Sequence, residues 1–349
     1  MLVNSLRKIL YPLSLIYGCI TRIRNYAFDH NILKSRSFEV PIIAVGNLNM
    51  GGTGKTPMVE YLLSQFHESC KTAVLSRGYG RKTKGFVLAG PNSSSSDLGD
   101  EPLQYFKKYK DVAVAVDEER VRGIEKLLGL TPDLELVLLD DAFQHRYVRA
   151  GYYILLTSYG DLYTDDLLLP AGNLRESKKG AERSDCIIIT KCPSGLSGEE
   201  QSRLIKKLNP LPLQRVYFSR IAYGKDVIGA HDRIPVRDLG GWNILLVTGI
   251  ANSKPMEEFL REKGLDFEKM NFGDHHYMGK KELSKIQKGL ESMAGPRKII
   301  LTTEKDYVRS FADLKQPVYY LPIRTEFISG GETFNESIQN YVRKNKGNG

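Results

Sequence analysis

Residues 41–62 read PIIAVGNLNMGGTGKTPMVEYL, and this stretch decides the fold of the chain. The apolar run 42–45 is typical of a short buried strand, and the apolar residues after Pro57 recur with helical spacing. A glycine-rich turn ending in Lys55 and Thr56 joins the two. A strand, a glycine loop and a helix in this order predict a phosphate-binding loop.

The chemistry of this loop follows from its residue types. Glycines let the backbone curl so that several N–H groups face one anion, and the helix N-terminus adds its dipole. Lys55 supplies a cation for the β- and γ-phosphates of a nucleotide, and Thr56 offers a hydroxyl to Mg²⁺. The predicted nucleotide-binding residues are Asn49, Met50, Gly51, Gly52, Thr53, Gly54, Lys55 and Thr56. Asn49 departs from the strict pattern, which has glycine there, and the alternative is a plain glycine turn between a strand and a helix.

Length and composition are those of a globular protein. The 349 residues are 41% hydrophobic and 26% charged, and they are enough for two modest domains. The formal net charge of +9 favours an anionic partner, either nucleic acid, a nucleotide or an anionic membrane surface. Nucleic acid is the weakest of these, because the basic residues form no stripe interleaved with aromatic side chains. The four cysteines show no C-x-x-C spacing and predict reduced thiols in the cytosol.

The N-terminal segment carries one apolar stripe with helical periodicity. Its members are Leu2, Leu6, Ile9, Leu13, Ile16, Ile20 and Ile23. The uncharged run 9–21 is shorter than the roughly 20 residues that span a bilayer, and no small-residue cleavage site follows as in a signal peptide. Two interpretations stay open: the helix lies in the membrane interface, or it packs on the sheet as a core helix. Pro12 is expected to kink or divide it.

Strand and helix patterns alternate after the phosphate loop. Strands are expected at 72–75, 87–89, 112–116 and 135–139, with helices near 103–109 and 118–128. This alternation predicts an α/β fold with a P-loop NTPase-like, mostly parallel sheet flanked by helices. We expect an N-terminal membrane-interface helix in 1–30, a core domain with the phosphate loop in 31–215, and a smaller C-terminal α/β domain in 216–349 that contributes to the active site.

The second chemical centre is LELVLLDDAFQHR, residues 134–146. An apolar strand that ends in aspartate is where a phosphate-loop enzyme places its metal-associated carboxylate. Asp140 and Asp141 are neighbours and face opposite ways in a strand, so only one of them easily faces Mg²⁺. Gln144 and His145 are candidates for supporting contacts. The alternative is an acidic turn after a strand.

The motif GDEP, residues 99–102, places Asp100 just before an expected helix. An aspartate there often caps the helix. The functional alternative is a carboxylate that accepts a proton from an attacking hydroxyl, as phosphoryl transfer to an alcohol requires. Further on, Lys191 resembles the start of a guanine-reading loop, but Pro193 stands where that loop needs aspartate.

Seven motifs in this order resemble the tetraacyldisaccharide 4′-kinase family of lipid A biosynthesis: GGTGKTP, SRGYGR, GDEP, DDAFQHR, LPAGNLRE, GDHH and TTEKD. The resemblance implies transfer of the ATP γ-phosphate, with Mg²⁺, to the 4′-hydroxyl of a tetraacyldisaccharide 1-phosphate, giving lipid IVA. It implies a lipid-anchored disaccharide substrate and a peripheral protein at the cytoplasmic face of a bacterial inner membrane, on an anionic surface. No nucleic-acid partner and no obligate protein partner are expected.

The resemblance also implies roles for single residues. Asp100 is the catalytic base, Lys55 acts on the phosphates, and His275 pairs with Asp100, although the adjacent His276 is an alternative. Thr56 with Asp140 or Asp141 holds the metal. The residues implied around the donor phosphates and the acceptor sugar are Arg77, Tyr79, Arg120, Gln144, Arg175 and Glu176.

Two other classes of protein remain as alternatives. One is a GTPase or ATPase switch of the metal-chaperone type, because variant glycine loops occur there. The missing aspartate after Lys191 argues against guanine specificity. The other is a non-catalytic nucleotide-binding module at a membrane, against which Lys55, Thr56 and the aspartate pair argue.

Overall fold

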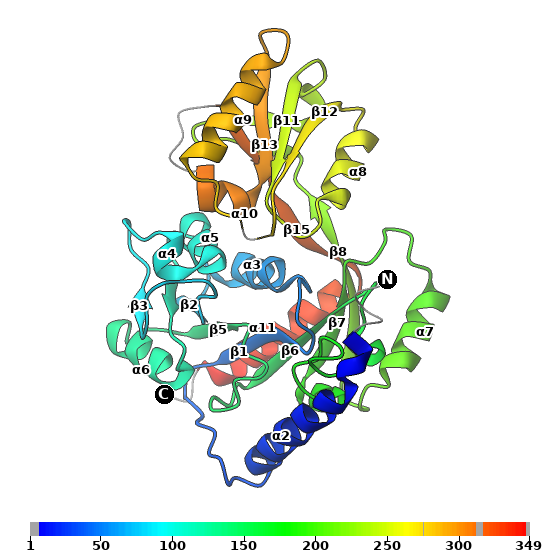
Figure 1. Cartoon of the computed structure of the whole chain (residues 1–349). Helices are drawn as coiled ribbons and strands as arrows, with labels where there is room; N and C mark the ends of the chain where they lie inside the picture. Colours follow the sequence, from blue (N-terminus) through cyan, green and yellow to red (C-terminus); the bar gives the residue numbers. More distant parts are fainter. Residues whose placement is uncertain (1–6, 275, 312–316, 347–349) are drawn as a thin grey trace. The chain divides into compact units, whose positions relative to one another are not determined.

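The chain forms two compact units in the computed structural model, which describes residues 7–274, 276–311 and 317–346 (Figure 1). The first unit holds the described residues up to Leu98, Tyr105–Ile221 and those from Thr325 onward. The second unit holds Gly99–Gln104 and Ala222–Arg324.

These bounds differ from the predicted ones at several boundaries: the N-terminal helix belongs to the first unit, and the second unit's long segment begins at Ala222 and not at residue 216. The prediction gave 216–349 to the smaller domain, but the chain from Thr325 onward belongs to the first unit. Its strand β15 is a neighbour of β8 in the first sheet, and its helix α11 packs into the first core. Residues 99–104 instead belong to the second unit, where Asp100 is ion-paired with Arg309.

A nine-stranded, mostly parallel sheet forms the first unit and confirms the predicted fold class. Its strands in spatial order are β15 (Ile323–Ser329), β8 (Arg215–Tyr223), β7 (Cys186–Thr190), β6 (Tyr152–Ser158), β1 (Ile42–Asn47), β5 (Leu136–Asp140), β2 (Thr72–Ser76), β4 (Ala113–Val116) and β3 (Val87–Leu88). β3 pairs antiparallel with β4. β1 lies between β5 and β6, so the phosphate loop and Asp140 leave neighbouring strands at the same edge of the sheet.

Helices cover both faces of this sheet (Figure 1). Those of the first unit are α2 (Tyr11–Asp29), α3 (Lys55–Phe66), α4 (Ser95–Leu98), α6 (Arg120–Leu130), α7 (Gly198–Leu208) and α11 (Gly331–Asn345), and α5 (Asp100–Lys108) crosses the boundary between the units. Short 3₁₀ turns lie at Lys8–Leu10, Tyr163–Asp165 and Lys178–Arg183.

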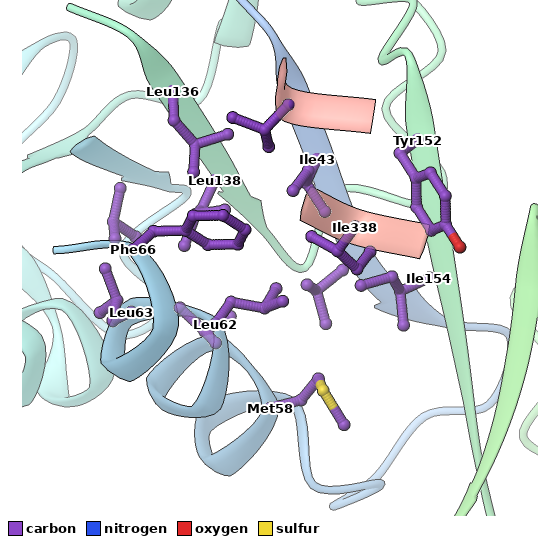
Figure 2. Close-up of a cluster of buried hydrophobic side chains, with 14 of the residues drawn as sticks. Ile43, Met58, Leu62, Leu63, Phe66, Leu136, Leu138, Tyr152, Ile154 and Ile338 are labelled. Atoms are coloured by element: carbon purple, nitrogen blue, oxygen red, sulfur yellow. The ribbon is translucent and has the colours of Figure 1, made fainter. Parts of the chain in front are cut away.

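Side chains of β1 and β5 alternate between two cores, as a strand requires. Ile43 and Leu138 pack with Phe66 of α3 and Ile338 of α11, as Figure 2 shows. Ile42 and Val137 point to the other face, among the residues that pack with Ile124 and Leu127 of α6. Burial of each such aliphatic side chain stabilises the fold by roughly 1.5–3 kcal/mol. Strands buried on both faces fix the position of the loop that follows β1.

The second unit has its own six-stranded sheet. Its spatial order is β10 (Arg233–Pro235), β9 (Asp226–Ile228), β14 (Val318–Leu321), β13 (Lys298–Thr303), β11 (Asn243–Thr248) and β12 (Phe267–Asn271). Its helical segments are a 3₁₀ turn at Val236–Asp238, α8 (Lys254–Glu262), α9 (Lys280–Ser292), α10 (Glu304–Asp306) and a π-helical turn at Tyr307–Phe311. Strands β14, β13, β11 and β12 run parallel, so this unit is also α/β.

The N-terminal helix α2 is amphipathic, but its apolar side faces outward. Ile16, Ile20 and Ile23 are 59%, 60% and 70% exposed. The interpretation as a core helix is therefore wrong. Pro12 lies in the first turn of α2, after the 3₁₀ turn, so it begins the helix and does not interrupt it. Within the part of the chain that the structure describes, no helix has the length and apolarity to cross a membrane.

Candidate functional site

The phosphate loop joins β1 to α3 as the sequence predicts. Gly51 has φ 126° and Gly54 has φ 85°, and these left-handed conformations are ones that only glycine adopts without strain. Gly54 is the N-cap of α3, so the first amides of that helix and its dipole face the loop.

The start of the loop is fastened to the segment 166–175. The Met50 amide donates to Asn173 O over 2.7 Å, and Asn49 Nδ2 donates to Asp166 Oδ2 over 3.0 Å. The Met50 amide is therefore engaged with the protein's own backbone. Asn49 is fully buried, which explains why the loop can use an amide side chain where the strict pattern has glycine: that side chain points into the protein.

Lys55 lies between two oxygen groups at the sheet edge. Its Nζ is 3.2 Å from Asn47 Oδ1 and 3.6 Å from Asp141 Oδ1. Asn47 is the last residue of β1 and is fully buried. Asn47 is a site residue that was not predicted, although an amide residue at the end of an otherwise apolar strand is visible in the sequence.

Asp141 forms ion pairs with two cations, Lys55 and Arg175. Arg175 NH1 lies 3.0 and 3.2 Å from its two oxygens, and Arg175 NH2 donates to Asn47 Oδ1 over 3.0 Å. Burial opposes ionisation of this carboxyl, but the charges of Lys55 and Arg175 outweigh burial and hold the pKa of Asp141 below its ordinary value. Asp141 has φ 48°, a conformation that aspartate tolerates better than most residues. The site thus holds two cations close to one ionised carboxylate.

Asp140 has different surroundings. It is the last residue of β5, is 5% exposed, and accepts a hydrogen bond from Ser76 Oγ over 3.2 Å. The two neighbouring aspartates therefore differ in their partners. Strand alternation does not explain this difference, because β5 ends at Asp140 and Asp141 follows it with a positive φ.

Gln144 and Glu176 form the support beneath this cluster. Gln144 Nε2 donates to Asn47 O over 2.8 Å, and Gln144 Oε1 accepts from Arg175 over 3.2 Å. Glu176 is 3% exposed, and its Oε1 accepts from Gln144 and from Arg183. These contacts show Glu176 holding its own loop in place. A direct contact with substrate stays a prediction for this residue.

Arg120 is buried beside the aspartate pair. It is 2% exposed, and its NH1 donates to Asp117 O over 3.0 Å. Its Nε is buried without a hydrogen-bond partner among the described residues. Burial lowers the pKa of Arg120 to about 10, partly offset by Asp140 and Asp141, so the group is a cation at neutral pH.

His145 Nε2 accepts a hydrogen bond from the Arg120 amide over 3.3 Å. Burial, and then the charges of Arg120, Arg24 and Arg77, lower the pKa of His145 to about 4. It is therefore a neutral acceptor at neutral pH. Two further predicted residues, Arg77 and Tyr79, lie at the surface, where Tyr79 is 73% exposed.

The second unit contains a separate polar cluster around Asp100, the first residue of α5. Arg309 Nε donates to Asp100 Oδ2 over 2.8 Å. Asp306, fully buried, lies 3.2 Å from Arg309 NH1 and accepts from the Gly249 amide over 2.9 Å. Burial raises the pKa of Asp306. Arg309 was not predicted, because nothing in its local sequence indicates a partner more than 200 residues away.

The histidine motif lies next to this cluster. His275 is outside the described residues, so its predicted role is not addressed by the structure. The backbone O of His276 accepts from Arg309 NH1 over 3.3 Å, and its ring stacks on Phe272 with centroids 5.2 Å apart. His276 Nε2 is buried without a hydrogen-bond partner among the described residues.

Comparisons with known proteins cover almost the whole chain. A family model described as tetraacyldisaccharide-1-P 4′-kinase matches residues 6–343. The tetraacyldisaccharide 4′-kinase of Flavobacterium johnsoniae is 48% identical over 343 residues, which are 98% of this chain and 99% of that protein. That of Bacteroides thetaiotaomicron is 43% identical over 362 residues, with 99% and 95% covered. The crystal structure of the "apo" form of LpxK from Aquifex aeolicus in complex with ATP has 27% identity and a TM-score of 0.77, with 97% and 99% covered.

Proposed function

The chain belongs to the tetraacyldisaccharide-1-P 4′-kinase family, and we propose that it transfers the γ-phosphate of ATP to the 4′-hydroxyl of a lipid A precursor at the phosphate loop. It is a phosphotransferase with an alcohol acceptor. The observation that supports this use of the site best is the cluster in which Lys55 and Arg175 flank Asp141 and Asn47, at the end of β1. Two cations beside a glycine loop suit a triphosphate.

The donor phosphates are proposed to bind along the loop to the N-terminus of α3. Lys55 is a mobile point charge, and its 3.6 Å distance from Asp141 is long for an ion pair, so little is lost when its ammonium turns to the β- and γ-phosphates. Arg175 is held on two sides by Asp141 and Asn47 and is proposed to stabilise the charge of the transferring group.

Thr56 and Asp140 fit Mg²⁺. The cation prefers oxygen ligands and is held in kinases by one or two carboxylates together with substrate phosphates. Among the described residues no group of three or more His, Cys, Asp or Glu side chains is arranged to hold a metal ion. We favour Asp140 over Asp141, because Asp141 already carries the ion pairs with Lys55 and Arg175. Mg²⁺ supplies neutralisation of phosphate charge when it is bound.

Asp100 is proposed as the catalytic base. It accepts the proton of the 4′-hydroxyl while that oxygen bonds to the γ-phosphorus and the bond to the ADP oxygen breaks. Arg309 orients the Asp100 carboxylate through the 2.8 Å hydrogen bond. His275 remains the proposed partner of this base, with His276 as the alternative.

The acceptor carries a sugar phosphate, and Arg120 and Arg77 are proposed to bind anionic groups of the substrate. The buried, unpartnered Nε of Arg120 supports this, because such a donor is costly unless a ligand uses it. Tyr79, exposed near Arg77 in the sequence, is proposed to contact the sugar.

The protein is proposed to lie on the cytoplasmic face of the inner membrane. The outward apolar side of α2 supports this, because the acceptor is a lipid and an interfacial helix concentrates the enzyme where the substrate is. The net charge of +9 suits an anionic surface.

The test is a kinase assay with γ-labelled ATP, Mg²⁺ and a detergent-dispersed tetraacyldisaccharide 1-phosphate, beside an acceptor-free control. We expect label in the lipid, lost in Lys55→Ala and in Asp100→Asn. Phosphate release without labelled lipid would contradict the proposal and favour a nucleotide-hydrolysing switch. Full transfer by a folded Asp100→Asn variant would remove Asp100 from the role of base.

A further inference from the structure

We propose that the polar side of α2 positions the two site residues Arg175 and Glu176, and that Tyr17 and Asn25 are the positioning residues. This rests on the proposed function for its meaning in catalysis. The helix would then do more than bring the protein to a lipid surface, because it also orders one wall of the phosphate site.

The contacts between α2 and the site loop are direct. Tyr17 Oη donates to Arg175 O over 2.7 Å, and Asn25 Nδ2 donates to Glu176 Oε2 over 2.8 Å. Arg24 NH2 adds a hydrogen bond to Gln144 O over 3.0 Å. Three residues of one helix side therefore hold the backbone or the side chain of three residues of the predicted site.

Ser14 in the first turns of α2, and Arg7 just before the 3₁₀ turn Lys8–Leu10, hold the beginning of the same loop. Ser14 Oγ donates to Leu168 O and accepts from the Ala171 amide, each over 3.0 Å. Arg7 Nε donates to Pro170 O over 3.0 Å, and its NH1 donates to Asn173 Oδ1 over 2.9 Å. The loop from Leu168 to Glu176 is thus held by hydrogen bonds at both of its ends.

The far side of this loop contacts the phosphate site. The Arg175 amide donates to Leu48 O over 2.8 Å, and Asn173 O accepts from the Met50 amide. Glu176 accepts from Gln144, which in turn donates to Asn47 O and accepts from Arg175. A continuous set of hydrogen bonds therefore leads from α2 to the residue that holds Lys55.

Glu176 is the residue at which the loss of a hydrogen bond from α2 is expected to affect the site most. It is 3% exposed, its Oε1 is shared by Gln144 and Arg183, and its Oε2 accepts from Asn25. A buried carboxylate that loses one donor either moves toward its remaining donors or leaves an oxygen unpaired. Either response shifts Gln144, and with it the support of Arg175.

The experiment compares positioning variants with an anchoring variant. Asn25→Ala removes the donor to Glu176, Asn25→Gln keeps an amide, and Tyr17→Phe removes only a hydroxyl. Ile16→Gln/Ile20→Gln changes only the exposed apolar side of α2. For each full-length protein the measurements are kcat and KM in detergent, binding to phosphatidylglycerol vesicles, and amide hydrogen exchange of residues 168–176.

We expect Asn25→Ala to lower kcat about tenfold and Tyr17→Phe to lower it severalfold, with KM for ATP and vesicle binding nearly unchanged. Amide exchange in 168–176 rises in both, and Asn25→Gln recovers part of the loss. The Ile16→Gln/Ile20→Gln protein shows the reverse pattern: weaker vesicle binding, with exchange in 168–176 unchanged.

Two results would overturn the proposal. One is wild-type exchange of 168–176 in folded Tyr17→Phe and Asn25→Ala proteins. The other is a kcat in detergent within twofold of wild type for both variants. If the wild-type protein transfers no phosphate to lipid, the proposed function fails instead, and the exchange measurement still decides whether α2 orders the loop.

Discussion

The outward side of α2 predicts the strength of membrane association. We consider the double substitution Ile16→Gln/Ile20→Gln, which replaces two apolar side chains by polar ones with good helix propensity. Both isoleucines lie in the interior of α2, and neither has a polar contact with the loop from Leu168 to Glu176 in the described structure. The change therefore tests lipid contact apart from folding.

The magnitude follows from exposure. Full burial of an isoleucine side chain is worth roughly 1.5–3 kcal/mol. Ile16 is 59% exposed and Ile20 is 60% exposed, and that part of each side chain is available to lipid. Each side chain then contributes about 1.5 kcal/mol to membrane binding, and the pair about 3 kcal/mol. A loss of this size weakens partitioning about 100-fold.

The assay is sedimentation with vesicles of phosphatidylglycerol and phosphatidylcholine at several salt concentrations. The matched control is Leu213→Gln, because Leu213 is 93% exposed and lies outside α2, between α7 and β8. If the double variant and the Leu213→Gln protein bind vesicles equally well, α2 is not the lipid-contacting surface. Wild-type binding that does not weaken as salt increases would refute the part assigned to anionic headgroups.

Three further predictions concern stability and reactivity. The pKa of His145 is about 4 in the folded protein against an ordinary 6.5, so the folded state loses about 2–3 kcal/mol of stability as the pH falls from 6.5 to 4. Urea unfolding at pH 7.5 and 4.5 measures this loss, and it should be smaller in His145→Gln. A neutral thiol reagent should label Cys19 alone in the folded protein, because Cys19 is exposed while Cys70, Cys186 and Cys192 are buried. Burial also raises the pKa of Cys192 to about 11. Rapid labelling that persists in Cys19→Ser would contradict this prediction. Gly46→Ala should lower the free energy of unfolding by about 1–3 kcal/mol, because the added Cβ lies 2.6 Å from Phe143 Cβ and 2.9 Å from its backbone N. The control is Gly129→Ala, whose added Cβ meets no atom of the described residues within 4 Å. Equal urea midpoints for the two variants would show that β1 can shift to make room.

The phosphate loop and the strands around it could be predicted from sequence because their signals are local. Apolar runs at 42–45, 72–75 and 135–139 became β1, β2 and β5, since each is buried on both faces. Glycine is required where φ is positive, as at Gly51 and Gly54, and this requirement is visible in the sequence itself. The chain length between such elements then leaves few arrangements of a parallel sheet.

The partners of the site residues could not be predicted in the same way. Arg309 contacts Asp100 across 209 positions, and Arg183 shares Glu176 with an asparagine from the N-terminal helix. Such pairs depend on which loops lie together in the folded chain, and the spacing of residues in the sequence does not predict this. The return of α11 to the first core was missed for the same reason: its apolar residues Phe334, Ile338 and Val342 indicate a helix face but not the sheet that this face covers.

Helix α2 shows why an apolar stripe alone cannot identify its environment. The periodicity from Leu2 to Ile23 predicts one apolar face, but it does not indicate which face of the helix packs against the rest of the protein. The polar side decides the matter, because buried polar groups must find partners. Ser14, Tyr17 and Asn25 all find them on the loop from Leu168 to Glu176, and Gly18 allows the close approach, since a Cβ there would lie 2.8 Å from Leu168 Cδ1. Because the polar side is used inside the protein, the apolar side faces outward, and an exposed apolar helix face of this kind suits the membrane contact proposed above.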